Sequence, residues 1–153
     1  MIMPNERICY IHIPRTGGCS IERAMYNVMF PQNTITRMTY EEKMMYGMFD
    51  MHMPLRAMEQ RYDLSDYRVF ATIRDESERM QSLIGHVGTH PGESGVWEST
   101  NWFLKTYEDT PVELVPFEGM AEFYEDLLGV PIPHLNKGGN RNVQLPPDVC
   151  NIR

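Results

Sequence analysis

The six residues that follow Pro14 bring together side chains and backbone that can hold an anion. The apolar run Arg7 to Ile13 alternates and predicts a strand, and helical spacing begins at Ile21. A turn between a strand and a helix start gathers unpaired N–H groups, to which the helix dipole adds partial positive charge. Two glycines let the backbone approach a ligand, two hydroxyls can donate to it, and an arginine offers a charged fork. We expect a cradle for a phosphate or sulfate group, made by Arg15, Thr16, Gly17, Gly18, Cys19 and Ser20.

This turn is not a Walker A loop, because "PRTGGCS" lacks the first glycine and the lysine of that motif. The stretch "IHIPRTGGCSI" instead resembles the 5′-phosphosulfate loop of sulfotransferases that use 3′-phosphoadenosine 5′-phosphosulfate, in the branch of bacterial and carbohydrate 2-O-sulfotransferases. Arg15 stands where that family usually has lysine, and Cys19 where it has threonine. The resemblance implies that the cradle binds the donor and that Arg15 stabilises the leaving phosphate oxygen. The alternative is a tight turn without a ligand.

A second motif lies in "VFATIRDESERMQSLI". A buried strand is predicted over Tyr67 to Ile73, and Arg74 follows at its carboxyl end, where open α/β sheets bind ligands. Arg79 and Ser82 are three residues apart and therefore neighbours on one helix face. We expect that face to differ from the buried stripe, which comprises Met80, Leu83, Ile84 and Val87.

The same stretch resembles the family pattern R-[DN]-P-x-x-R-x-x-S, with Glu76 in place of the proline. The resemblance implies that Arg74, Arg79 and Ser82 bind the 3′-phosphate of the donor. The alternative for Arg79 is an ordinary i,i+4 ion pair with Asp75. Asp75 and Glu78 also form a capping-box pattern, which predicts a helix start at this point.

Two further residues are assigned from the family resemblance. A histidine lies between the two phosphate motifs of the carbohydrate enzymes, and His52 has that position here. A neutral imidazole suits the removal of a hydroxyl proton, so we expect His52 to be the general base. Its alternative role is to cap a helix that begins near Pro54. Lys137 lies in a segment that would reach the nucleotide, and His12 is expected to be structural.

The remaining pattern alternates strands and helices. Helices are predicted from Tyr40 to Tyr46, from about Ser99 to Tyr107, and through Met120 to Leu128, where Gly129 ends the last one; a strand is predicted over Val112 to Phe117. We therefore expect an α/β fold, a P-loop-like three-layer domain with a central, mostly parallel sheet flanked by helices. Residues 1–153 would form a single domain with an irregular tail from about residue 131.

Composition narrows the classes of function. The 153 residues carry 14 Lys and Arg against 21 Asp and Glu, a net charge of -7, which argues against a nucleic-acid partner. The three cysteines show neither zinc spacing nor a complete disulfide framework, and no apolar run reaches membrane-spanning length. We expect a cytoplasmic, metal-free sulfotransferase acting on a hydroxyl of a carbohydrate or small molecule. A non-catalytic nucleotide-binding protein and an atypical P-loop phosphotransferase are the alternatives; the sequence does not indicate an oligomeric state.

Overall fold

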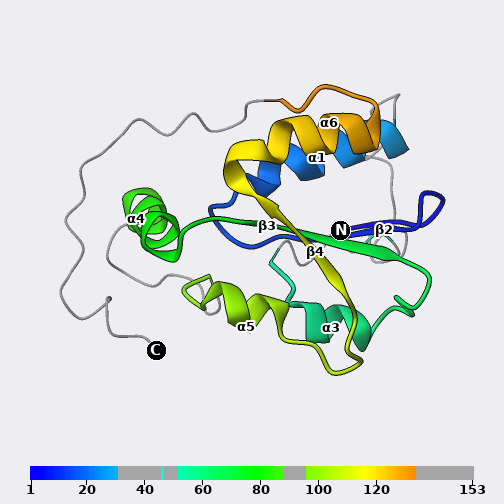
Figure 1. Ribbon diagram of the computed structural model, residues 1–153, viewed down its shortest axis with the longest axis horizontal. Helices are drawn as coiled ribbons and strands as arrows, with labels where there is room; N and C mark the ends of the chain where they lie inside the picture. Colours follow the sequence, from blue (N-terminus) through cyan, green and yellow to red (C-terminus); the bar gives the residue numbers. More distant parts are fainter. Residues whose placement is uncertain (31–45, 47–51, 88–95, 134–153) are drawn as a thin grey trace.

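The computed structural model describes residues 1–30, 46, 52–87 and 96–133. This part of the chain has an α/β fold, with a four-stranded sheet in the order β1-β2-β3-β4 and helices on both sides of it (Figure 1). Strand β1 runs antiparallel to β2, whereas β2, β3 and β4 run parallel. The elements are β1 (Ile2–Met3), β2 (Ile8–Ile11), α1 (Gly18–Met29), α3 (Leu55–Glu59), β3 (Arg68–Ile73), α4 (Glu76–Val87), α5 (Thr100–Leu104), β4 (Val112–Pro116), η2 (Phe117–Gly119) and α6 (Met120–Leu128).

The predicted elements are present with small shifts at their ends. The first helix begins at Gly18, two residues before Ser20, and the helix expected from Ser99 ends at Leu104 rather than Tyr107. Asp75 accepts a hydrogen bond from the backbone N–H of Glu78 at 3.1 Å, which is the capping contact that the sequence predicts. Gly129 ends α6 with φ of 66°, a left-handed conformation that favours glycine. The helix expected over 40–46 and the tail beyond residue 133 lie outside the described residues, apart from Tyr46.

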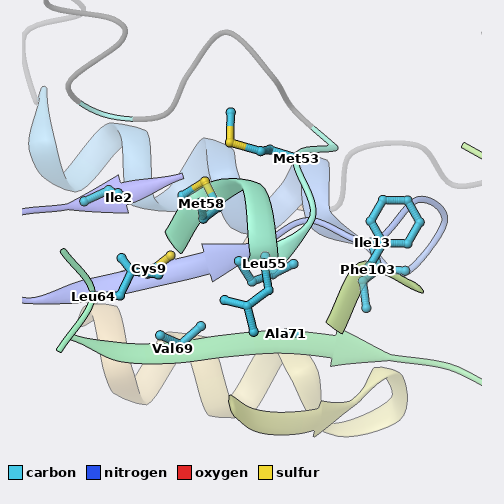
Figure 2. Close-up of a cluster of buried hydrophobic side chains, with 11 residues drawn as sticks. Ile2, Cys9, Ile13, Met53, Leu55, Met58, Leu64, Val69, Ala71 and Phe103 are labelled. Atoms are coloured by element: carbon cyan, nitrogen blue, oxygen red, sulfur yellow. The ribbon is translucent and has the colours of Figure 1, made fainter. Parts of the chain in front are cut away.

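The two central strands of the sheet, β2 and β3, are buried on both faces. Along β2, Cys9 and Ile11 belong to one apolar cluster, while Ile8 and Tyr10 belong to the other. The first cluster packs against α3 and α5 on one side of the sheet, as Figure 2 shows for Leu55 and Phe103. The second cluster packs against α1 and α6 on the opposite side (Figure 1). The alternation in the sequence therefore marks two buried faces rather than one buried and one solvated face.

A chain of three hydroxyl groups crosses the second cluster. The hydroxyl of Tyr10 donates to Thr72 Oγ1 at 3.3 Å, and Thr72 Oγ1 in turn donates to the hydroxyl oxygen of Tyr124 at 3.4 Å. Burial raises the pKa of both tyrosines, so both stay neutral and can act as donors. These bonds satisfy polar groups that would otherwise be costly to bury, and they tie β2, β3 and α6 together.

Glu59, at the end of α3, holds the segment that leads into β4. Its carboxylate accepts hydrogen bonds from the hydroxyl of Thr106, the backbone N–H of Tyr107 at 2.7 Å and the hydroxyl of Thr110 at 2.6 Å. Burial alone would raise the pKa of Glu59, but these bonds outweigh it and lower the pKa below the ordinary value of 4.5.

We predict that Glu59→Gln lowers the free energy of unfolding by about 1 kcal/mol at neutral pH, because partly hydrated charge-assisted bonds are replaced by weaker ones. A lowered pKa gives stability that is present above pH 4.5 and is lost as the pH falls through the folded-state value. The difference in the free energy of unfolding between wild type and Glu59→Gln should therefore become smaller below pH 4.5. Urea unfolding between pH 3 and 7 measures the free energy of unfolding of both proteins, and it resolves differences on the order of tenths of a kcal/mol. Glu113→Gln, at an exposed pair with Arg68, is the control; equal effects of the two variants would contradict the assignment.

Candidate functional site

The parallel pairing of β2 with β3 brings the two sequence motifs together. Its register aligns Ile8 with Arg68 and Ile11 with Ala71, so the turns after both strands leave the same edge of the sheet. Arg15 lies in the first turn, and its Nε atom donates to the hydroxyl of Ser82 on α4 at 3.0 Å. Residues 67 positions apart in the chain are thus in direct contact.

The backbone of the first turn is unusual in two places. Arg15 has φ of 67° and Gly17 has φ of 85°, both in the left-handed region. Arginine rarely adopts this conformation, and such residues cluster at functional sites, where the surrounding structure holds them. The N–H of Ser20 bonds to the carbonyl of Gly17 at 3.0 Å, which closes the first turn of α1. The N–H groups at the start of this twelve-residue helix and its dipole can therefore face an anion.

Thr16 does not offer its hydroxyl proton to a ligand. The side chain is fully buried, and Oγ1 donates to the carbonyl of Ile13 at 2.8 Å, which stabilises the turn. Ser20 is also almost fully buried, at 4% exposure. The expectation that two hydroxyls line the cradle is therefore wrong for Thr16, whose role is to fix the turn.

The space beside the two glycines is occupied by other side chains of the protein. A Cβ atom at Gly17 would lie 2.5 Å from the side chain of Met120, and one at Gly18 would lie 2.1 Å from the ring of His12. Real Cβ atoms essentially never approach other atoms so closely. Close packing of α6 and of His12 against the turn therefore requires both glycines, and the close approach to a ligand that the sequence suggests stays a prediction.

Arg15 and Arg74 place two positive charges at this edge. Arg74 Nε donates to Glu78 at 3.0 Å, and its guanidinium lies 4.7 Å from the ring centre of Phe117. Burial is the main cause that lowers the pKa of Arg15, and the nearby charge of Arg74 lowers it further. Among the residues that the structure describes, no carboxylate is paired with Arg15. A guanidinium in this setting favours an anionic ligand.

Arg79 is not on an accessible face, and this corrects the expectation from the sequence. Its side chain is fully buried, and it donates to both carboxylate oxygens of Glu76, at 3.1 and 2.6 Å. It also donates to the carbonyl of Pro14 at 3.4 Å and to the carbonyl of Glu98 at 2.6 Å. Its acidic partner is Glu76 rather than Asp75. Arg79 therefore joins α4 to the start of the cradle and to the segment before α5.

His52 lies beside His12 near the cradle. Its Nδ1 atom is 3.3 Å from the carbonyl oxygen of His12, and the two rings meet edge to face with centres 4.6 Å apart. Because a carbonyl can only accept, this contact places the proton on Nδ1 and the basic lone pair on Nε2. Pro54, not His52, is the residue at the start of α3, so the capping alternative is wrong.

A cluster at the cradle that the sequence did not reveal contains Cys19, His12 and Glu22. His12 is 3% exposed, and its Nδ1 atom lies 3.1 Å from Glu22 Oε2. The contact is short enough for an ion pair but is not aligned as a hydrogen bond, so the attraction is mainly electrostatic. The influence of this imidazole is the main cause that lowers the pKa of Cys19 below its ordinary value of 9.0. The i,i+3 spacing predicts that Cys19 and Glu22 are neighbours on one helix face. The position of His12 beside Glu22 could be seen only in the fold.

Comparison with known proteins finds no match. No family model matches the chain, and no curated protein or solved structure does either. Within the described ranges, no group of three or more His, Cys, Asp or Glu side chains could hold a metal ion. The same ranges contain no helix with the length and apolar character needed to cross a membrane. Lys137 lies outside the described residues.

We predict that Arg79→Met lowers the free energy of unfolding by about 2–4 kcal/mol, because the buried carbonyl of Pro14, the partly buried carbonyl of Glu98 and the carboxylate of Glu76 lose their donor. Arg74→Met is the matched control and should cost about 1 kcal/mol or less, since its ion pair is partly exposed. Urea unfolding followed by circular dichroism measures both. Equal losses in the two variants would contradict the structural role of Arg79.

Proposed function

We propose that this protein transfers a sulfuryl group from 3′-phosphoadenosine 5′-phosphosulfate to a hydroxyl of a carbohydrate or small-molecule acceptor. The observation that carries the proposal is the 3.0 Å hydrogen bond between Arg15 and Ser82. It joins the turn that resembles a 5′-phosphosulfate loop to the motif that resembles a 3′-phosphate site. A P-loop-like arrangement, with both anion sites at the carboxyl edge of parallel strands, is part of this proposal.

In this proposal the backbone N–H groups at the start of α1 and the guanidinium of Arg15 bind the 5′-phosphosulfate. The guanidinium of Arg15, which pairs with no carboxylate among the described residues, suits a donor that carries several negative charges. Arg74 and Ser82 bind the 3′-phosphate. Arg79 and Thr16 are positioning residues, because the first holds α4 against Pro14 and the second holds the turn.

The reaction step needs one base and one stabilised leaving group. His52 Nε2 accepts the proton of the acceptor hydroxyl as the acceptor oxygen forms a bond to sulfur. The bond between sulfur and the bridging phosphate oxygen breaks, and its electron pair stays on the phosphate. Arg15 and the N–H groups stabilise that negative charge. Arginine holds its proton tightly, so stabilisation here is electrostatic rather than by proton transfer.

We predict that the wild-type chain binds adenosine 3′,5′-bisphosphate more tightly than AMP. Arg74→Ala and Ser82→Ala should each weaken bisphosphate binding about tenfold or more, because hydrogen bonds to charged groups contribute about 1.5–3 kcal/mol. Arg74→Ala should leave AMP binding unchanged, whereas Ser82→Ala should weaken it as well, because Ser82 holds Arg15, which binds the 5′ group. Arg68→Ala is the control, since that exposed arginine lies at the amino end of β3.

Isothermal titration calorimetry measures these affinities directly. If the wild-type chain binds the bisphosphate no better than AMP, the assignment of a 3′-phosphate site is wrong. Bisphosphate binding without transfer of radiolabelled sulfate to a panel of hydroxyl acceptors would favour a non-catalytic nucleotide-binding protein. Transfer of phosphate from ATP that depends on magnesium would favour a phosphotransferase instead.

We predict that His52→Ala keeps bisphosphate affinity but lowers the rate of sulfuryl transfer by a factor on the order of 10²–10⁴, the usual contribution of a general base. His86→Ala is the matched control, because that histidine is exposed near the end of α4. A full transfer rate in His52→Ala would remove His52 as the base.

A further inference from the structure

The imidazoles of His12 and His52 form a pair beside the cradle, and the carboxylate of Glu22 contacts one of them. His12 directly follows β2, and its Nδ1 atom lies 3.1 Å from Glu22 Oε2 on α1. The same ring meets the ring of His52 edge to face, with ring centres 4.6 Å apart. His12 is therefore in contact with both a carboxylate and a second imidazole.

The backbone of His12 also orients the ring of His52. His52 Nδ1 lies 3.3 Å from the carbonyl oxygen of His12, and a carbonyl can only accept a hydrogen bond. The proton of a neutral His52 is therefore on Nδ1, and the basic lone pair is on Nε2. The two ring planes are inclined by 72°. His12 thus contacts His52 with its main chain and with its side chain.

Close packing holds the ring of His12 beside Glu22. The His12 side chain is 2% exposed and the Glu22 side chain 15% exposed. A Cβ atom at Gly18 would lie 2.1 Å from Cδ2 of the imidazole, so the backbone of α1 fills the space on that side of the ring. The ring has little room to turn away from the carboxylate. An ion pair at this distance, with little water around it, is weakly screened.

A proton on one imidazole of the pair disfavours a proton on the other. Two positive charges on rings 4.6 Å apart repel each other, so the pair takes up its protons in two coupled steps. The direct contact with Glu22 favours the proton on His12.

The titratable groups around His12 come from three parts of the fold. Glu22 and Cys19 lie on α1, Tyr10 lies on β2 with its ring centre 6.1 Å away, and His52 precedes α3. Burial raises the pKa of Tyr10, so that hydroxyl stays neutral. Burial by itself lowers the pKa of His12, but the influences of Cys19 and Glu22 outweigh this and raise the pKa above 6.5. The surroundings of His12 therefore favour its charged form.

We propose that Glu22 and His12 are positioning residues for His52. Glu22 holds a proton on the imidazole of His12, and this positive charge keeps the neighbouring His52 neutral and able to accept a proton at Nε2. Its use in catalysis rests on the proposed function, in which His52 takes the proton of the acceptor hydroxyl. An unperturbed histidine is half protonated at a pH of about 6.5, so the effect is largest at mildly acidic pH.

The first test follows both imidazoles by NMR in the full chain, without nucleotide or acceptor. Long-range proton–nitrogen spectra report the protonation state and the tautomer of each ring between pH 5 and 8. The His52→Ala variant identifies the signals of His52. In the wild type we expect His52 to take up its proton at a lower pH than His12, and its neutral form to carry the proton on Nδ1. The opposite order, or a neutral His52 with its proton on Nε2, would overturn the proposal.

Variants test the charge that Glu22 and His12 supply. Glu22→Gln keeps a side chain of similar size, and His12→Gln keeps the backbone carbonyl that contacts His52. Each should raise the titration midpoint of His52 by about half a pH unit or more, because a neighbouring positive charge is lost. Glu108→Gln is the control, since that exposed carboxylate precedes the amino end of β4, away from the cradle. An unchanged midpoint of His52 in Glu22→Gln would overturn the proposal.

The pH dependence of sulfuryl transfer separates positioning from a merely structural role. Glu22→Gln should transfer about twofold to threefold more slowly than the wild type at pH 6, and equally fast at pH 8, where His52 is neutral in both proteins. A loss by the same factor at every pH would overturn the positioning role.

The two tests also distinguish this proposal from the proposed function. If NMR shows the coupled pair but no hydroxyl acceptor receives sulfate, the pair stands and the proposed function fails. If transfer occurs and the acidic side of the pH profile is the same in Glu22→Gln and in the wild type, the positioning role fails and the proposed function stands.

Discussion

The parallel pairing of β2 with β3 is the constraint on which this site depends. Parallel strands direct their carboxyl ends to one edge, so the register that sets Ile11 beside Ala71 also sets the turn after β2 beside the start of α4. The Arg15–Ser82 hydrogen bond is possible only because of this alignment. A shift of one residue would exchange the two buried faces of β2, which the apolar clusters on both sides forbid.

Two arginines near the carboxyl ends of β2 and β3 have different roles, because one is buried and the other is accessible. The guanidinium of Arg79 is fully buried, and its four oxygen contacts join Glu76, Pro14 and Glu98 into one unit. That unit is structural, since the side chain of Arg79 is fully buried and already bonds to four oxygen atoms of the protein. The guanidinium of Arg15, half-buried and bonded to a neutral hydroxyl, keeps its charge for an anion.

Close packing against other parts of the chain shapes the turn. Met120 fills the space beside Gly17, and the His12 ring fills the space beside Gly18. The absence of a side chain at Gly18 thereby lets the buried imidazole of His12 pack against the start of α1, where its Nδ1 atom lies 3.1 Å from Glu22 Oε2.

The sequence alone was enough to predict most elements and their order, since apolar periodicity, the Asp75 cap and the stop at Gly129 are local signals. It also placed Arg15, Arg74 and Ser82 at one edge, because parallel strands share their carboxyl ends. The fold was needed to show that Arg79 is buried against Pro14 and Glu98 and that Arg15 reaches Ser82. Those outcomes depend on contacts between residues distant in the chain, about which spacing within a single segment carries no information.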